Sequence, residues 1–265
     1  RSTLLASSAA SDVYKRQPTG SVIVEKFVKN DGVVVFYTFS NGKMYFSGLE
    51  DKYPVKYQKQ GSYVGGLFVF ESKLTQEFRL HFDEKIAEMF QSIGIREGSV
   101  WIEVFHDGEN YYFNEVGFRY GGSVSIYPVD YFYQINQVAA DIHYALTGES
   151  CISEHTSLIR STLPRKKYYC IYPVHINAGT ISSISGLDKI AQLENIVYLA
   201  TTKYLHDRIE SSGSFSQVFA LVHFVCNTTE ECIQTIDRIH QMLVVFDEHG
   251  NNMVNRMLDV GKIIF

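Results

Sequence analysis

The stretch "WIEVFHDGENYYFNEVGFRYGG", residues 101–122, decides the fold of this chain. Two runs that alternate between polar and apolar residues flank Asp107-Gly108, and such a pair between strand-like runs predicts a β-hairpin. One glutamate lies on each predicted strand, Glu103 on the first and Glu115 on the second, and Arg119 follows. The hairpin therefore carries two carboxylates and a guanidinium among many aromatic rings.

The length of the hairpin loop decides which face each glutamate occupies. A two-residue loop would place Glu103 and Glu115 on opposite faces of the sheet. A three-residue loop, residues 107–109, places them on one face as diagonal neighbours, with Cα atoms roughly 7–8 Å apart. We expect the second arrangement, with Arg119 on the same face by alternation.

Two carboxylates on one face repel each other unless a cation lies between them. Mg²⁺ in proteins commonly takes one or two carboxylates together with phosphate oxygens, and a guanidinium nearby can hold a phosphate or a carboxylate. Spacing alone leaves a second interpretation open, in which Glu115 pairs with Arg119 at a sheet edge and Glu103 is solvated.

Composition indicates an ordinary globular protein. Hydrophobic residues make up 45% of the 265 residues and charged residues 20%, the net charge is −5, and no apolar run reaches the length of a membrane span. We therefore expect a cytoplasmic protein with neither nucleic-acid nor membrane partners. The nine histidines show no zinc-binding spacing, and the four cysteines, which form no CxxC pair, are expected to be reduced, buried thiols: Cys151, Cys170, Cys226 and Cys232.

The first seventeen residues, "RSTLLASSAASDVYKRQ", do not read as native sequence. They lack an initiating methionine, and "DVYKRQ" back-translates readily into the end of a transposon-based sequencing adapter. The short apolar run is unlike a signal peptide. We interpret residues 1–17 as a non-native, disordered segment and expect the remainder to be a C-terminal fragment of a longer protein.

The remaining pattern predicts an α+β fold in two parts, residues 18–163 and 164–265, separated by the polar stretch 149–167. The first part combines strands with two helices, at 75–93 and at about 131–146, and Asn41-Gly42 predicts a hairpin turn. The second part contains strands and a helix opened by a capping box, Thr228 with Glu231. The expected strands are 21–28, 33–39, 43–49, 99–105 and 110–118, then 168–176, 179–185, 196–204 and 217–225.

The hairpin resembles the metal-binding strands of ATP-grasp enzymes. Upstream, "VIVEKFV" resembles the adenine hinge of that family, and the tail from "GTISSISGLDKIAQLENIVYL" onward resembles the small C-terminal domain of its carboxylate–amine ligases. The resemblance covers nearly all of residues 18–265. It implies an antiparallel ATP-grasp subdomain followed by a small α/β domain.

The resemblance also implies roles for individual residues. Glu103 and Glu115 would hold Mg²⁺ (or Mn²⁺), and Arg119 would be the catalytic residue that stabilises charge on the transferring phosphoryl group. Gly121, Gly122 and Ser123 would let the substrate approach. The residues that would meet ATP are Glu25, Lys26, Phe27 and Val28 at the adenine and Asp31 at the ribose. Core packing is the alternative for the side chain of Phe27.

The implied activity is that of a carbon–nitrogen ligase. A substrate carboxylate attacks the γ-phosphate of ATP to give an acyl phosphate, and an amine then displaces phosphate. The sequence "YGGS" after Arg119 differs from the signature that follows this arginine in biotin carboxylases. It favours a ligase of amino-acid or peptide type that joins a carboxylate to an amine. Alternatives are an ATP-grasp carboxylase or carbamoyl-phosphate-type enzyme, and a nucleotide-binding relative without turnover.

Two departures from the family pattern bear on these roles. Gly117 stands where the family often has an asparagine ligand, so the site can hold one metal ion or two. The phosphate-binding lysine and glycine-rich lid that precede the hinge in the family have no counterpart in this chain, so we expect it to be inactive alone. Small-molecule carboxylate and amine substrates are the expected partners, a homodimer is left open, and Tyr53 to Gly66 is a candidate specificity loop.

Overall fold

The computed structural model describes residue 28, residues 32–152 and residues 167–265. The predicted non-native segment, most of the adenine hinge with Glu25, Lys26, Phe27 and Asp31, and the predicted boundary at 163/164 lie outside these residues. Val28 is described and is half-buried, outside any helix or strand. Among the described residues, no helix is long and apolar enough to cross a membrane.

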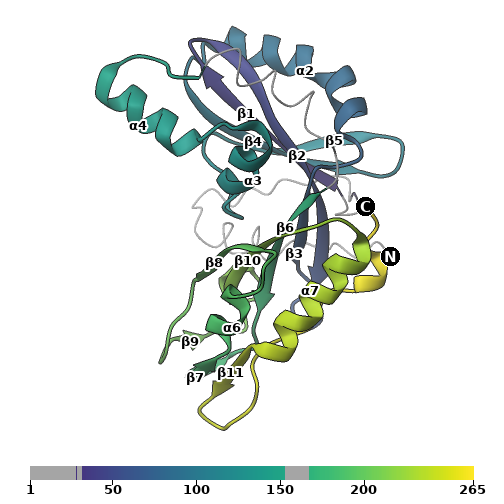
Figure 1. The fold of residues 1–265 in the computed structure, drawn as a ribbon. Coiled ribbons are helices and arrows are strands. Elements are labelled where there is room, and N and C mark those ends of the chain that lie inside the picture. Colours follow the sequence, from purple (N-terminus) through teal and green to yellow (C-terminus); the bar gives the residue numbers. More distant parts are fainter. Residues whose placement is uncertain (1–27, 29–31, 153–166) are drawn as a thin grey trace, which may run out of the picture.

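One eight-stranded sheet runs through the protein in the order β5-β4-β1-β2-β3-β6-β10-β8, and every neighbouring pair is antiparallel (Figure 1). Its strands are β1 (Gly32–Ser40), β2 (Lys43–Lys56), β3 (Tyr63–Phe70), β4 (Gly98–His106), β5 (Tyr111–Gly117), β6 (Tyr168–His175), β8 (Ile196–Thr201) and β10 (Val218–Cys226). This is the mixed α+β architecture, dominated by an antiparallel sheet, that the sequence predicts.

A second, three-stranded sheet has the order β11-β7-β9, and helices lie around both sheets. Its strands are β7 (Gly179–Ser185), β9 (Arg208–Ile209) and β11 (Val244–Asp247). The helices are α2 (Thr75–Ser92), α3 (Ile126–Tyr133), α4 (Gln137–Thr147), α6 (Leu187–Ala191) and α7 (Thr229–Met242), with 3₁₀ turns η2 (Phe215–Gln217) and η3 (Val260–Lys262). In Figure 1, α2, α3 and α4 gather at the β1–β5 end, and α6 and α7 lie beside β6 and β10.

Local signals predict most of these elements correctly. Asn41 and Gly42 both have positive φ, 51° and 77°, which is the backbone of a type I′ hairpin turn. The cap of α7 is also confirmed, because the Thr228 side chain accepts a hydrogen bond from the Glu231 N–H at 3.2 Å. The Glu231 carboxylate accepts from the Asn227 N–H at 2.7 Å, one residue before the usual capping-box partner.

Two predictions about elements are wrong. The helix predicted at 131–146 is two helices, α3 and α4, because Gln134 adopts the left-handed conformation with φ 53° and ends the first one. Strand β3 lies partly in a segment that the sequence analysis treats as a loop. It matters for the fold, since β3 pairs with β2 on one side and with β6 on the other.

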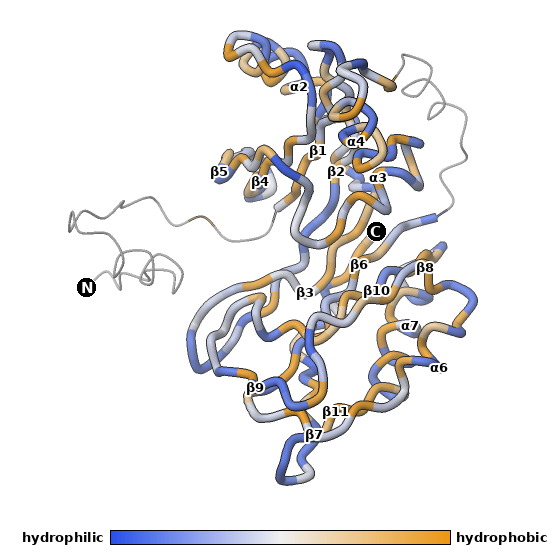
Figure 2. The backbone as a smooth tube through the Cα atoms, turned by 90° about the vertical axis from the view of Figure 1, so that its left-hand side faces the viewer, coloured by the Kyte–Doolittle hydropathy of each residue, from blue (hydrophilic) through white to orange (hydrophobic). Residues whose placement is uncertain are grey.

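Strands β3 and β6 place alternate residues in two hydrophobic cores. Phe68 and Ile171, which are cross-strand partners, belong to the first core, and their neighbours Val69 and Cys170 belong to the second. The hydropathy colouring of Figure 2 shows hydrophobic residues gathered along these central strands. A division of the chain near residue 163 remains a prediction, and the sheet is continuous across the two parts.

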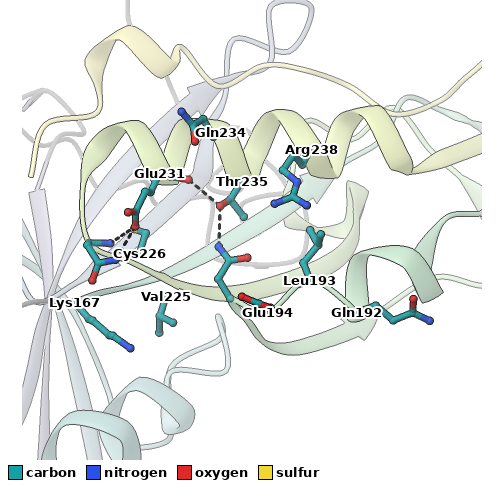
Figure 3. A pocket seen from close by; sticks show the side chains of 12 residues that line it. Lys167, Gln192, Leu193, Glu194, Val225, Cys226, Glu231, Gln234, Thr235 and Arg238 are labelled. Carbon is teal, nitrogen blue, oxygen red and sulfur yellow. Dashed lines mark hydrogen bonds between the residues drawn. The ribbon is translucent and has the colours of Figure 1, made fainter.

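The second core is closed by α7, whose buried face includes Cys232, Ile236 and Ile239. Beside α7, a pocket of about 600 Å³ opens between the helix, the end of β10 and the turn before β8 (Figure 3). Thr235 in its wall accepts a hydrogen bond from the Asn195 side chain at 2.8 Å, which ties α7 to that turn.

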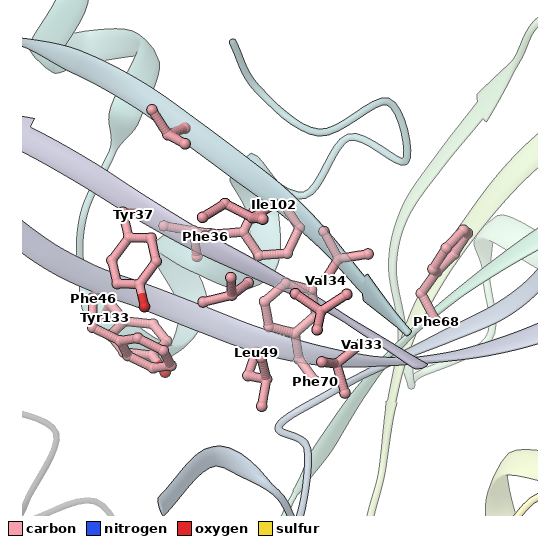
Figure 4. Packing of buried hydrophobic residues seen from close by; sticks show 14 of the residues in the cluster. Val33, Val34, Phe36, Tyr37, Phe46, Leu49, Phe68, Phe70, Ile102 and Tyr133 are labelled. Carbon is pink, nitrogen blue, oxygen red and sulfur yellow. The ribbon is translucent and has the colours of Figure 1, made fainter. Parts of the chain in front are cut away.

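The first core lies around β1, β2 and β4 (Figure 4). Helix α2 covers one of its faces through Phe78 and Phe82, which pack against Tyr111 and Phe113 of β5. The opposite face receives the segment before α3, because Gly121 packs so closely on Phe36 that a Cβ atom there would clash with the ring. The candidate site residues lie on this second face.

Candidate functional site

Glu103 and Glu115 lie directly opposite each other on β4 and β5. The expectation that both glutamates share one face of an antiparallel hairpin is therefore confirmed. The expected diagonal arrangement is wrong, since the two residues are direct cross-strand partners, whose Cβ atoms typically lie about 4.5–5.5 Å apart.

The predicted three-residue loop is also wrong. His106 pairs with Tyr111, so the loop has four residues, 107–110. The Asp107 carboxylate accepts hydrogen bonds from the backbone N–H groups of Glu109 and Asn110 at 3.1 and 2.8 Å. These hydrogen bonds lower the pKa of Asp107 to about 2. The aspartate thus stabilises a longer turn than the Asp-Gly pair alone suggests.

A β-bulge at Asn114 sets the final register. The pairing shifts between Val104–Phe113 and Glu103–Glu115, which leaves Asn114 as the extra residue on β5. Phe113 packs toward α2, so strict alternation would turn Glu115 toward α2 as well. The bulge turns Glu115 to the face of Glu103 instead, and the Asn114 side chain donates a hydrogen bond to the Glu103 carboxylate at 2.6 Å.

Glu103 has a cationic partner that the sequence analysis does not identify. Lys52, on β2, forms a short salt bridge with the Glu103 carboxylate, and its ammonium lies 5.0 Å from the centre of the Phe105 ring. The side chains of Lys52 and Glu103 are 6% and 22% exposed. Glu115 is exposed and forms no hydrogen bond or ion pair with the described residues, so its carboxylate is available to a ligand.

A third glutamate, Glu50, lies in the same row. Val34 of β1 pairs with Glu50 on one side and with Glu103 on the other, so Glu50, Glu103 and Glu115 occupy one line across the sheet. Glu50 is 1% exposed, and its Oε2 atom has no hydrogen-bond partner among the described residues. Burial raises the pKa of Glu50 well above its ordinary value, against the nearby charge of Lys52.

The signal for Glu50 and Lys52 is present in "SGLEDKY", where Glu50 and Lys52 flank Asp51 and therefore project from the same face of the strand. Alternating charges in a strand usually indicate a solvated face. Both side chains are buried instead, and they lie on the face of the candidate metal ligands.

Arg119 lies over Trp101 on this face. The guanidinium carbon is 5.0 Å from the centre of the indole ring, and the guanidinium donates a hydrogen bond to the Tyr120 carbonyl at 2.8 Å. Trp101 precedes Glu103 by two residues, so both project from the same face of β4. Arg119 is exposed, and its charge borders the row of glutamates. No salt bridge between Arg119 and Glu115 is present among the described residues, so the edge ion pair is not formed.

Gly117, the departure from the family pattern, has a packing reason. It pairs with Trp101, and a Cβ atom at Gly117 would clash with the indole nitrogen and the ring atoms beside it. An asparagine side chain at this position is therefore incompatible with the indole where it now lies. The carboxylates of Glu103 and Glu115 remain as the predicted ligands on these two strands.

Gly121, Gly122 and Ser123 form the turn that leads to α3. Gly121 packs against Phe36 and Ser125, whereas a Cβ atom at Gly122 would meet nothing within 4 Å. Ser123 is buried, and its backbone approaches His223 of β10. Burial lowers the pKa of His223 to about 3, partly opposed by the Ser123 backbone, so this histidine is neutral.

The fold is that of the ATP-grasp enzymes. The chain superposes on the L-amino acid ligase from Bacillus licheniformis with a TM-score of 0.66 and 20% identity, over 84% of this chain and 55% of that one. It superposes on phosphoribosylglycinamide synthetase from Anaerococcus prevotii with a TM-score of 0.68 and 13% identity, over 90% of this chain and 58% of that one. A third match is the biotin carboxylase domain of 2-oxoglutarate carboxylase from Hydrogenobacter thermophilus, solved with MgADP, ADP and bicarbonate. Its TM-score is 0.66 at 15% identity, over 89% of this chain and 51% of that one.

These similarities define the fold, and the chain spans about half the length of the structures it matches. No family model and no curated protein sequence matches the chain. The ATP-grasp resemblance seen in the hairpin is therefore confirmed at the level of architecture. The neighbours include both ligases and carboxylases.

Proposed function

We propose that this chain is part of an ATP-dependent carboxylate–amine ligase in which Glu103 and Glu115 hold Mg²⁺ (or Mn²⁺) on the phosphates of ATP. The observation that carries the proposal is the cross-strand pair itself. Two carboxylates directly opposite each other destabilise a hairpin unless a cation compensates them. Glu115 has no partner among the described residues, and oxygen ligands of this kind suit Mg²⁺.

The surrounding residues would then act by charge and position. Arg119, held over Trp101, would stabilise negative charge on the transferring phosphoryl group or on the acyl phosphate. The turn Gly121–Gly122–Ser123 would let the substrate approach, because the position of Gly122 is open. Bound Mg²⁺ would neutralise charge on the phosphate oxygens. Glu25, Lys26, Phe27, Val28 and Asp31 remain the proposed nucleotide-binding residues.

The test is the affinity of the chain for ATP in the presence of Mg²⁺ or Mn²⁺, measured by calorimetry. Glu115→Gln removes a charge at nearly constant volume, and an interaction with a charged group contributes about 1.5–3 kcal/mol. We therefore expect Kd to rise by about 10- to 100-fold. Glu109→Gln, in the exposed loop of the same hairpin, is the matched control and should leave Kd unchanged. Equal affinities of wild type and Glu115→Gln would contradict the metal assignment.

The choice of a ligase over a carboxylase rests on the "YGGS" sequence and is tested separately. In the presence of MgATP, a pool of amino acids should raise the Tm of the chain, since a ligand that binds only the folded state stabilises it. Bicarbonate should not. Stabilisation by bicarbonate alone would favour the carboxylase.

A second candidate is a nucleotide-binding relative without turnover. Lys52 already neutralises Glu103, and Gly117 supplies no ligand, so the two strands offer fewer metal contacts than the family pattern. This candidate predicts ATP binding that is independent of Mg²⁺ and unaffected by Glu115→Gln. The calorimetric titration described above therefore separates the two functions.

A further inference from the structure

Three cysteines meet inside the second core, away from the glutamate row. The sulfur of Cys170 lies 3.7 Å from that of Cys226 and 3.8 Å from that of Cys232, and all three sulfur atoms lie within 4.8 Å of one another. All three are free thiols, and the residues are 0%, 3% and 0% exposed. The fourth cysteine, Cys151, is exposed and lies outside the cluster.

Regular elements position each thiol. Cys170 pairs with Phe224, and Cys226 follows Phe224 by two residues on β10, so Cys170 and Cys226 are diagonal neighbours on the face that α7 covers. Cys232 lies on the buried face of α7. It directly follows Glu231, whose N–H donates the capping hydrogen bond to Thr228. The cluster is therefore built on rigid strands and a capped helix, which fixes the spacing of the sulfur atoms.

We propose that Cys170, Cys226 and Cys232 form a binding site for a thiophilic metal ion, with Zn²⁺ as the ion whose size the spacing fits. Zn²⁺ is bound by thiolates at about 2.3 Å in a tetrahedron, whose edge is then about 3.8 Å. The two shortest sulfur–sulfur distances, 3.7 and 3.8 Å, equal that edge. Thiolate ligands select soft or borderline ions such as Zn²⁺ and Cu⁺ over Mg²⁺.

The pocket beside α7 gives an ion a route to the thiols. Cys226 lines this pocket of about 600 Å³, together with polar residues of α7 and of the turn before β8 (Figure 3). Cys170 and Cys232 lie behind it in the core, and neither lines the pocket. Three thiols supply three of the four ligands that Zn²⁺ takes, and a water molecule that enters from the Cys226 side can supply the fourth.

Binding is balanced by proton release. Three thiols and one Zn²⁺ give a tris-thiolate complex of net charge −1 and three protons, which leave for the solvent. Lys167 and Arg238 line the pocket and offset this charge, although Glu194 and Glu231 line it too. The Glu231 carboxylate is already engaged by the backbone and side-chain amides of Asn227, at 2.7 and 2.9 Å.

The experiment uses the whole chain, reduced with a phosphine, freed of metal and titrated with Cd²⁺ and then Zn²⁺ under excess Mg²⁺. Magnesium occupies oxygen ligands such as Glu103 and Glu115 and leaves thiolates free. We expect one Cd²⁺ per chain, a thiolate-to-cadmium charge-transfer absorption in the ultraviolet, loss of that absorption only under a large excess of Zn²⁺, and a higher Tm with metal. Cys226→Ser should weaken binding by more than about 100-fold, since outer-shell changes alone cost 10–100-fold.

Cys151→Ser is the matched control and should bind metal as wild type does. Thermal melts of the metal-free proteins check that Cys226→Ser is folded, and Cys170→Ala and Cys232→Ala provide two further variants should it fail. The proposal is overturned by absence of the charge-transfer absorption in the folded, reduced chain. Binding that survives in all three cluster variants, or that is lost in Cys151→Ser, also overturns it.

Discussion

Replacement of Lys52 by methionine tests how the glutamate row is stabilised. Methionine retains most of the packing volume but removes the ammonium that pairs with Glu103. Removing one partner of a buried ion pair costs about 3–5 kcal/mol, because the other charge is left uncompensated. Glu103 is 22% exposed and keeps its hydrogen bond from Asn114, so we expect the lower end, about 3 kcal/mol. That corresponds to roughly a 100-fold shift in the unfolding equilibrium.

Urea unfolding at neutral pH measures this cost, and two further variants make it specific. Lys56→Met, at an exposed position of the same strand, should change the free energy of unfolding by about 0.5 kcal/mol or less. The double variant Lys52→Met/Glu103→Gln should recover most of the loss, because it removes both charges of the pair.

Mg²⁺ links this test to the proposed metal site. In Lys52→Met the uncompensated carboxylates of Glu103 and Glu115 should gain more from a divalent cation than they do in the wild type, where the ammonium already lies against Glu103. The free energy of unfolding of the variant should therefore rise with Mg²⁺ concentration more steeply. A loss no larger than that of Lys56→Met would refute the account of the ion pair, and equal Mg²⁺ dependence would refute a shared site.

Two other substitutions probe the same face. Burial holds the pKa of Glu50 well above its ordinary value of 4.5, so the folded state keeps a proton that the unfolded state releases, and the contribution of Glu50 to stability should fall as pH rises above 4.5. Glu50→Gln should remove this contribution, so the pH slopes of the variant and the wild type in urea melts should differ by up to about 1.4 kcal/mol per pH unit, whereas Asp51 and His223 contribute equally to both proteins. An unchanged slope would show that Glu50 is not the group responsible. Gly117→Asn should cost about 1–3 kcal/mol by overpacking Trp101, and a variant as stable as wild type by thermal melt would show that the indole moves freely.

Local signals were sufficient for much of the fold. The turn at Asn41-Gly42, the apolar periodicity of α2 and the cap of α7 depend on neighbouring residues, and sequence reasoning identified each of them. The division between α3 and α4 depends on one left-handed residue, Gln134, of a type that does not mark a break. Strand β3 contains Gly65 and Gly66, which weaken its local strand signal, and pairing on both sides stabilises it.

The candidate site divides in the same way. The spacing of Glu103 and Glu115 was visible in one hairpin, but their partners Glu50 and Lys52 come from β2, which reaches β4 only across β1. The three cysteines of the thiol cluster lie on β6, β10 and α7, so no short sequence motif predicts the cluster. Contacts between distant strands therefore supply what local patterns could not.

The hairpin shows how a correct conclusion followed from a wrong register. A three-residue loop without a bulge and a four-residue loop with one bulge both place Glu103 and Glu115 on the same face. They differ in distance, since the first gives diagonal neighbours and the second gives direct partners. Direct partners repel more strongly, so the observed register makes a compensating cation more important than the predicted one did. In the structure Lys52 lies against Glu103 and leaves Glu115 exposed. A divalent ion that binds Glu115 would therefore find the carboxylate of Glu103 beside it, already oriented by Lys52 and Asn114. Such an ion would not need to order the hairpin itself.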